Sequence, residues 1–320
     1  MRTATSKSVG TLKIKPKRRS LGREIIRQRS LVLLSLPIFI YVFIFNYVPL
    51  FGLTMAFQKF KPAKTFFEQE WVGLENFKKL FTNEHFIRVL RNTVCMSLIN
   101  IILSFICAIG LAILINEIKH KTYKKVVQSV SYLPHFLSWI IVTGLVHNFL
   151  TSEGGLLNDI LMSLGIIKEN VHWLAEPKYF WGIVAGAHIW KETGWNSIIY
   201  LAAISGINPE LYEAAYMDGA NRFQRIRYIT LPGIKSTFVV LLILNLGWIL
   251  NAGFEVQYLL GNGIVQDVSE TIDIFVLKYG IRQMNYSFAT AAGMFKSVVS
   301  IIMLTGANFL AGKLGEDKLI

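Results

Sequence analysis

The chain has few charged side chains and almost no cysteine. Of its 320 residues, 17% are charged and 53% are hydrophobic, whereas soluble globular domains carry roughly a quarter charged residues. This composition argues against a soluble globular protein. The two cysteines, Cys95 and Cys107, lie in one apolar segment, which excludes a disulfide framework and a cysteine-based metal site.

Motifs for catalysis and nucleotide binding are also missing. The sequence has no Gly-x-x-x-x-Gly-Lys-Ser/Thr segment, so no P-loop of this chain cradles the phosphates of ATP. Neither His-Glu-x-x-His nor Gly-x-Ser-x-Gly occurs, and His120, His135 and His147 are scattered. We therefore predict no catalytic residue, no metal site and no cofactor bound by this chain itself.

Acidic residues are scarce near the N-terminus. The formal net charge is +13, but the basic residues are concentrated in residues 1–30, where Glu24 is the only acid. Such a cluster before a long apolar run orients a membrane protein with its N-terminus in the cytoplasm. We predict a basic cytoplasmic tail over 1–30 and no nucleic-acid partner. A secretory signal peptide is disfavoured because the apolar run reaches spanning length.

Six apolar stretches approach the roughly 20 residues that a helix needs to cross a bilayer. With a cytoplasmic N-terminus, six crossings place 116–125, 205–233 and the C-terminal tail inside, and the first two carry several Lys and Arg residues. Loop 54–91 is an exception, since it carries many basic residues on the predicted outer side. The predicted spans of a single membrane domain over 31–320 are 31–53, 92–115, 126–150, 181–204, 234–258 and 287–311.

The segment between the fourth and fifth stretches carries a spaced motif. It reads Glu-Ala-Ala, three residues, Gly, nine residues, then Ile-x-Leu-Pro, and its fixed positions are Glu213, Ala214, Ala215, Gly219, Ile229, Leu231 and Pro232. This pattern resembles the cytoplasmic EAA loop of binding-protein-dependent ABC import permeases. In that family the loop sits in a groove of the ATPase subunit and transmits its closure to the membrane helices.

Local chemistry agrees with a helix-turn-helix over the loop 206–232. Asn208 can cap a helix that has Pro209 at its first position, and Asp218-Gly219 can end it, because glycine takes the left-handed conformation readily. Asn221 can begin a second helix that carries Arg222. With Asp218 and Arg222, the seven motif residues form the predicted ATPase-coupling set. The alternative is an ordinary amphipathic surface helix.

Further blocks extend the resemblance over nearly the whole chain after residue 30. They are residues 46–52, 71–77, 91–93, 132–139 and 190–195, and they are similar to permeases that import complex or oligomeric saccharides; the maltose-type permeases are more distant. The resemblance implies an all-α integral membrane protein of the bacterial cell membrane, with six transmembrane helices, the type I ABC importer permease fold and a cytoplasmic coupling helix. The partners it implies are a second, non-identical permease, an ABC ATPase dimer that binds ATP and Mg, an extracytoplasmic solute-binding protein, a saccharide and membrane lipid.

Polar and aromatic residues within the fourth and fifth spans are candidate cargo contacts. Such residues are costly in a membrane unless they face a cavity or another helix, and sugar recognition uses aromatic rings together with amide or carboxylate groups. The alternatives are packing between helices, interfacial anchoring and, for Lys191-Glu192, an internal salt bridge. The predicted substrate-binding residues are Trp190, Trp195, Asn196, Asn245, Trp248, Asn251 and Glu255.

A rival interpretation is a secondary transporter or channel that works without ATP. It would show inverted repeats or intramembrane acids poised for protonation. Only Glu192 and Glu255 approach that description, and the EAA loop would have no role. We therefore predict a permease subunit that is not itself an enzyme, in an ATP-driven importer of an oligosaccharide or polysaccharide fragment.

Overall fold

The computed structural model describes residues 28–313, in two compact units divided between Leu53 and Thr54. All of the predicted basic tail except its last three residues lies outside the described residues. The first unit holds α2 (Arg29–Val42), the π-helical η1 (Phe43–Tyr47) and the start of the 3-10 helix η2 (Val48–Phe57). No residue of α2 is buried, as expected of an apolar helix whose surface is left to lipid or to another subunit.

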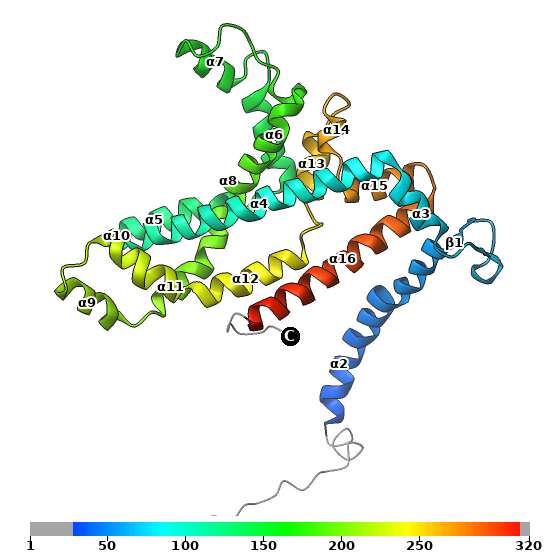
Figure 1. Ribbon diagram of the computed structural model, residues 1–320, viewed down its shortest axis with the longest axis horizontal. Coiled ribbons are helices and arrows are strands. Elements are labelled where there is room, and N and C mark those ends of the chain that lie inside the picture. The colour runs from blue at the N-terminus through cyan, green and yellow to red at the C-terminus, as the bar shows by residue number, and fades with distance from the viewer. Residues whose placement is uncertain (1–27, 314–320) are drawn as a thin grey trace, which may run out of the picture. The chain divides into compact units, whose positions relative to one another are not determined.

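The second unit is helical apart from one short hairpin (Figure 1). Strand β1 (Gln58–Lys59) pairs antiparallel with β2 (Glu70–Trp71). The longer helices are α4 (Glu84–Asn116), α5 (Lys121–Tyr132), α6 (Trp139–Leu150), α8 (Pro177–Ser205), α12 (Lys235–Gly247) and α16 (Tyr286–Lys313). The shorter ones are η3 (Phe66–Glu68), α3 (Glu75–Thr82), η4 (Leu133–Phe136), α7 (Leu156–Ser163), η5 (Trp173–Ala175), α9 (Pro209–Met217), α10 (Arg222–Arg225), η6 (Ile226–Thr230), α11 (Leu231–Gly233), α13 (Phe254–Leu260), α14 (Gln266–Ser269), α15 (Ile272–Leu277) and η7 (Lys278–Arg282).

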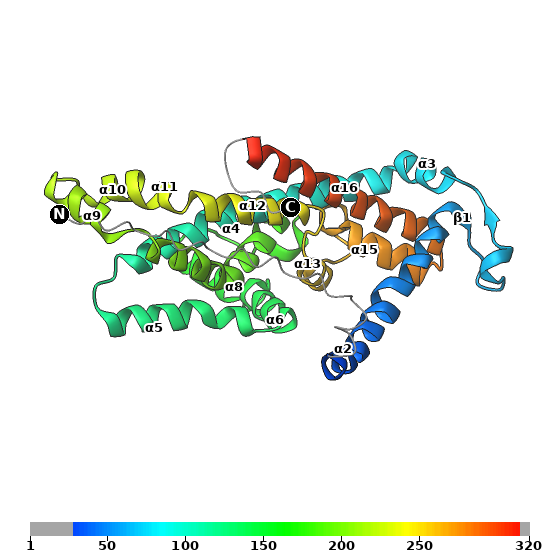
Figure 2. The ribbon, with the colours of Figure 1, turned by 90° about the horizontal axis from the view of Figure 1, so that it is seen from below.

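Helix α4 is the long axis of the second unit. Asn83 caps its first turn by accepting a hydrogen bond from the backbone N–H of Phe86, and its 33 residues make it about 50 Å long at 1.5 Å per residue. It packs along α8, and the two run side by side in Figure 2. At its ends lie different elements, with α3 and α15 near the N-terminus and α10 near the C-terminus (Figure 1). This separation positions the two sites described below.

Three helices are long and apolar enough to cross a membrane: Arg29–Phe57, Glu84–Asn116 and Tyr286–Lys313. Two bent pairs raise the number to five if each pair counts as one span. Helix α8 has the length of a span, with 29 residues, but carries the charged pair Lys191-Glu192 at its middle. The all-helical character predicted from the sequence is therefore present, with differences in detail at the third and fifth predicted spans.

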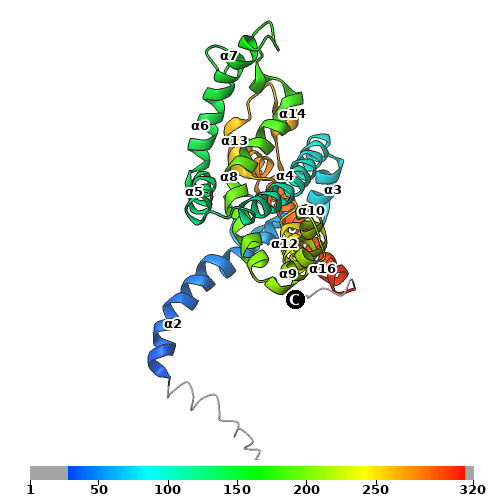
Figure 3. The ribbon, with the colours of Figure 1, turned by 90° about the vertical axis from the view of Figure 1, so that its left-hand side faces the viewer.

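The third predicted span, 126–150, is not one straight helix. Residues Lys121–Phe136 and Trp139–Leu150 meet at 99°, and Ser138 caps the second helix by accepting from the backbone N–H of Ile141. In Figure 3, α6 runs upward from this bend toward α7. The fifth predicted span, 234–258, is interrupted too: α12 ends at Gly247 and the next α-helix, α13, begins at Phe254. Gly253, with φ of +89°, directly precedes α13.

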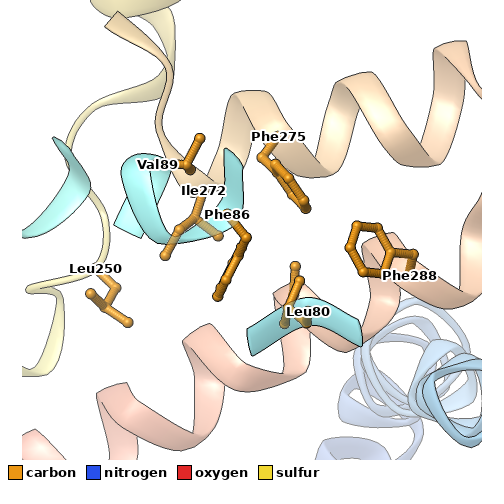
Figure 4. Packing of buried hydrophobic residues seen from close by; sticks show 8 residues of the cluster. Leu80, Phe86, Val89, Leu250, Ile272, Phe275 and Phe288 are labelled. Atoms are coloured by element: carbon orange, nitrogen blue, oxygen red, sulfur yellow. The ribbon is translucent and has the colours of Figure 1, made fainter. Parts of the chain in front are cut away.

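A hydrophobic cluster fixes the N-terminal end of α4 (Figure 4). Phe86 of α4 contacts Phe275 of α15 with ring centroids 5.4 Å apart, and Phe275 contacts Phe288 of α16 at 5.6 Å. Edge-to-face and tilted aromatic pairs of this kind stabilise beyond the area they bury. The cluster thereby ties α3, α4, α15 and α16 into one block, whose buried members are Leu80, Phe86, Val89, Leu250, Ile272, Phe275, Phe288 and Ala292.

Candidate functional site

The predicted coupling loop forms two short helices joined by a left-handed turn. Helix α9 begins as predicted, with the Asn208 side chain accepting from the backbone N–H of Glu210 at 3.0 Å and Pro209 at its first position. It ends at Met217, and Gly219, two residues further on, has φ of +78°. The backbone N–H groups of Gly219 and Ala220 donate to the carbonyls of Tyr216 and Ala215, which is the Schellman arrangement of a helix end.

The second half of the loop is capped independently. The Asn221 side chain accepts from the backbone N–H of Gln224 at 2.9 Å, and the Gln224 side chain accepts from that of Asn221 at 2.8 Å. This reciprocal capping box begins α10. The loop is tied to the next helices because the Tyr212 hydroxyl of α9 lies 3.0 Å from the Thr230 hydroxyl of η6. The helix-turn-helix predicted from the sequence is thus present.

Most of the coupling residues lie at the surface. Glu213, Ala214, Asp218, Gly219, Arg222, Leu231 and Pro232 are exposed, whereas Ala215 and Ile229 are half-buried. Between them lie large apolar side chains that sequence reasoning missed: Tyr216, Met217 and Phe223 are 69%, 83% and 70% exposed. Their signal was available, because apolar residues in a charged loop between spans have no lipid to cover them. An exposed apolar patch rimmed by charge marks a protein-binding surface.

A cavity of about 310 Å³ lies among the membrane helices. Four of the seven predicted cargo residues line it, namely Asn196 of α8, Asn245 of α12, and Trp248 and Asn251 of the interruption that follows. Asn196 donates to the Ser104 hydroxyl at 3.2 Å. The side-chain amide of Asn251 has no hydrogen-bond partner among residues 28–313. The interruption after Gly247 therefore brings an aromatic ring and an exposed amide to the cavity wall.

Helix α4 supplies polar groups that the sequence analysis did not identify. Ser97, Asn100 and Ser104 line the cavity together with His188 of α8. The buried Ser97 hydroxyl and Asn100 amide oxygen find no hydrogen-bond partner in the described part of the chain. Their spacing of three and four residues places them on one helical face, so the pattern was present in the sequence although α4 was treated as a plain apolar span.

The other predicted cargo residues lie elsewhere. Trp195 stacks on the ring of His135, with centroids 4.5 Å apart and an interplanar angle of 4°. Trp190 is 49% exposed, and Glu255 is exposed in the first turn of α13. None of the three lines the 310 Å³ cavity. Their role in cargo binding stays a prediction.

The charged pair of α8 forms an internal network. The Lys191 ammonium lies 3.1 Å from the Glu192 carboxylate and donates to the backbone carbonyl of His135 at 2.5 Å. The other Glu192 oxygen lies 2.8 Å from Nδ1 of His135. Gly194 lets the neighbouring helix approach, since a Cβ there would lie 1.9 Å from the carbonyl oxygen of Ser131. Lys191 and Glu192 therefore fasten the bend between α5 and α6 to α8.

Apolar helices long enough to cross a membrane, an exposed and doubly capped loop, and a polar cavity between helices are together typical of one class of protein, the membrane permeases. Residues 100–315 match the family described as binding-protein-dependent transport system inner membrane component. The chain belongs to this family, and the predicted fold class is confirmed. It is an integral membrane protein and a permease subunit.

Curated relatives and solved structures are similar to this protein over almost the full length of the chain. Protein LplB of Bacillus subtilis (strain 168) is 42% identical, with 92% of each chain covered. The polygalacturonan/rhamnogalacturonan transport system permease protein YteP of the same organism is 43% identical, with 95% of this chain and 94% of YteP covered. A crystal structure of a bacterial ABC transporter involved in the import of the acidic polysaccharide alginate is 41% identical with a TM-score of 0.84, covering 92% of this chain and 98% of that one. The structure of the bacterial alginate ABC transporter in complex with an alginate pentasaccharide-bound periplasmic protein is 39% identical with a TM-score of 0.86, covering 93% of this chain and 99% of that one.

Proposed function

We propose that this chain is one transmembrane permease subunit of an ATP-driven importer that translocates an oligosaccharide or polysaccharide fragment. The observation that carries the proposal is the coupling loop, in which both helices are capped and an apolar patch is exposed between charged residues. The substrate class is supported by the similar proteins, which are transporters of polygalacturonan, rhamnogalacturonan and alginate.

The partners follow from the same loop. An ABC ATPase dimer docks on α9 and α10 and binds ATP and Mg, so that the permease itself hydrolyses nothing. A second, non-identical permease completes the pathway, and an extracytoplasmic binding protein delivers the saccharide; the solved alginate complex contains such a periplasmic protein.

Coupling runs through packed elements of the described chain. ATP-driven closure of the ATPase moves α9, whose Tyr212 contacts Thr230 of η6. Through α11 the movement reaches α12, which carries Asn245 into the cavity wall. Movement of the coupling loop thereby changes the cavity and opens it outward, and hydrolysis resets the inward-facing state.

The loop and the α15 end of the molecule lie on opposite sides of the membrane. Arg222 of the loop lies 3.8 Å from Glu117, just after the C-terminal end of α4, whereas Glu270 contacts His85 in the first turn of α4. A helix of about 50 Å separates the two contacts, more than the roughly 30 Å of a hydrocarbon core. The basic tail and 209–229 are assigned to the cytoplasm, and 54–91 and 259–286 to the outside.

Cysteine labelling tests this orientation. In a chain whose Cys95 and Cys107 are replaced by serine, Arg222→Cys should react with a membrane-impermeant maleimide only after the cells are opened. Ile264→Cys, at a position 69% exposed, should react in intact cells. Labelling of position 222 from outside would reverse the assignment.

Photo-cross-linking tests the partner. A benzophenone amino acid in place of Met217, which is 83% exposed on the coupling loop, should cross-link to the ATPase subunit in membranes that contain the assembled importer. The same group in place of Ile264 should not. If Met217 gives no ATPase adduct while the complex co-purifies, the ATPase does not dock on this loop and the proposal fails.

A secondary transporter is less well supported. The acid of α8 that could be poised for protonation, Glu192, is already paired with Lys191 and His135. Glu255 lies outside the polar cavity. Such a transporter would also leave the exposed loop without a function.

A further inference from the structure

A second pocket, of about 400 Å³, lies near the N-terminal end of α4, among α13, α14, α15 and η7. One of its lining residues, Glu270, contacts His85 of α4, so the pocket lies at the end of the molecule opposite the coupling loop. The polar side chains of its wall include Gln257, Tyr258, Gln266, Glu270, Lys278 and Arg282. We call it the outer pocket.

The charges in the outer pocket do not cancel. Glu270 is buried and receives hydrogen bonds from Lys278 at 3.0 Å and Gln266 at 2.8 Å. Burial alone would raise the pKa of Glu270, but hydrogen bonds from Lys278 and His85 outweigh it and hold the pKa below its ordinary value. The ionised Glu270 therefore offsets the charge of Lys278. Nearby Asp267 is paired with Arg88 at 3.0 Å.

Arg282 is the remaining cation of the pocket. No carboxylate of residues 28–313 lies within ion-pair distance of it. Its guanidinium donates to the Tyr258 hydroxyl at 2.9 Å and lies 6.0 Å from the centre of that ring. A neutral partner leaves the positive charge available while it restricts the side chain. Arg282 is thus held at the pocket as a site for an anion, and a guanidinium matches a carboxylate in a two-pronged geometry.

The same wall offers groups suited to a sugar ring. Tyr258 stacks on Phe254 at 5.2 Å and remains 41% exposed, so part of this residue is accessible from the pocket that it lines. The side-chain oxygen of Gln257 is buried without a hydrogen-bond partner among the described residues, and its nitrogen donates to the carbonyl of Ala252 at 2.8 Å. A buried acceptor of this kind costs free energy unless a ligand donates to it.

We propose that the outer pocket binds a uronic-acid residue of the incoming saccharide, with Arg282 receiving its carboxylate, Tyr258 stacking on its ring and Gln257 accepting from a hydroxyl. This inference rests on the proposed function and narrows its substrate to acidic oligosaccharides. Ala252, the partner of Gln257, lines the 310 Å³ cavity. One hydrogen bond thereby links the wall of the outer pocket to the wall of the 310 Å³ cavity, whose Asn and Ser groups carry no charge.

Calorimetric titration of the assembled importer in nanodiscs, without the binding protein, tests the site. The probes are tetragalacturonate, an alginate tetrasaccharide and fully methyl-esterified tetragalacturonate, which keeps the ring but loses the charge. Arg282→Gln should weaken binding of an acidic probe about tenfold, as expected for the loss of a charged hydrogen bond, and should leave the ester unchanged. Arg282→Lys, which keeps the positive charge, should weaken binding of the acidic probes less than Arg282→Gln does. Lys168→Gln, which removes an exposed cation that does not line the pocket, should bind like the unchanged importer.

Three results would overturn the site. The first is that neither acidic probe binds. The second is that Arg282→Gln leaves the affinity for the acidic probes unchanged, or weakens binding of the acidic probes and the ester equally. The third is that Arg282→Gln weakens docking of the sugar-free binding protein, which would assign the arginine to a carboxylate of that protein. In each case ATP-dependent sugar uptake by the unchanged importer would leave the proposed function standing. Absence of any ATP-dependent uptake, neutral or acidic, would count against the proposed function instead.

Discussion

Replacing Gly219 by proline should reduce saccharide uptake to background while the protein still reaches the membrane. Gly219 has φ of +78° and donates its backbone N–H to the carbonyl of Tyr216, whereas proline fixes φ near −65° and has no N–H. The turn between α9 and α10 would rearrange, and the surface offered to the ATPase would be lost. Space is not the reason, because a Cβ at position 219 meets nothing within 4 Å.

Two variants sharpen this result. Gly219→Asn should retain most of the uptake, because asparagine tolerates the left-handed conformation better than other side chains. Glu213→Lys, an exposed change on α9 that leaves the turn intact, should also abolish uptake by reversing a charge offered to the ATPase. Uptake is measured with labelled oligosaccharide in cells and divided by the amount of importer in the membrane. Normal uptake with Gly219→Pro would show that the turn has no part in coupling.

Trp248→Ala and Asn251→Ala should each lower uptake several-fold without loss of assembly. Trp248 is 67% exposed and lines the 310 Å³ cavity with Asn251, so truncation removes a stacking surface or an amide rather than a packed core group. A lost hydrogen bond costs about 0.5–1.5 kcal/mol net, or roughly two- to tenfold in affinity. Basal ATP hydrolysis by the assembled complex should be unchanged.

The control is Trp71→Ala, which removes a tryptophan that is 63% exposed and remote in sequence from the cavity residues. It should leave uptake per assembled complex unchanged. If Trp248 serves in packing, its variant should instead lose assembly or thermal stability, and uptake should fall only with the amount of surviving complex. Unchanged uptake per complex in both cavity variants would remove these residues from the cargo path.

The coupling loop could be predicted from sequence because its structure is local. Caps at Asn208 and Asn221 and the turn at Gly219 depend on residues within a few positions of each other, and the spacing of the motif is readable directly. The exposed patch around Met217 was missed, although apolar side chains in a charged loop between spans indicated it.

The membrane part was predicted less completely because its breaks depend on distant partners. The 99° bend after Phe136 is held by Lys191 and Glu192, which lie more than fifty positions away in the sequence. Hydropathy reports apolar length and cannot report such contacts. The unwound segment 248–253 likewise looked like part of one span, although it is what brings Trp248 and Asn251 together with Asn196 of α8.

The most direct test of ATP-driven saccharide import measures saccharide uptake by proteoliposomes. Their membrane contains this permease with its partner permease and ATPase, and the binding protein is supplied outside. Uptake should require ATP and Mg on the side of the coupling loop together with binding protein on the other side, and it should disappear with Glu213→Lys. An imposed proton or sodium gradient without ATP should drive none. Uptake that follows such a gradient and proceeds without ATP would contradict the account.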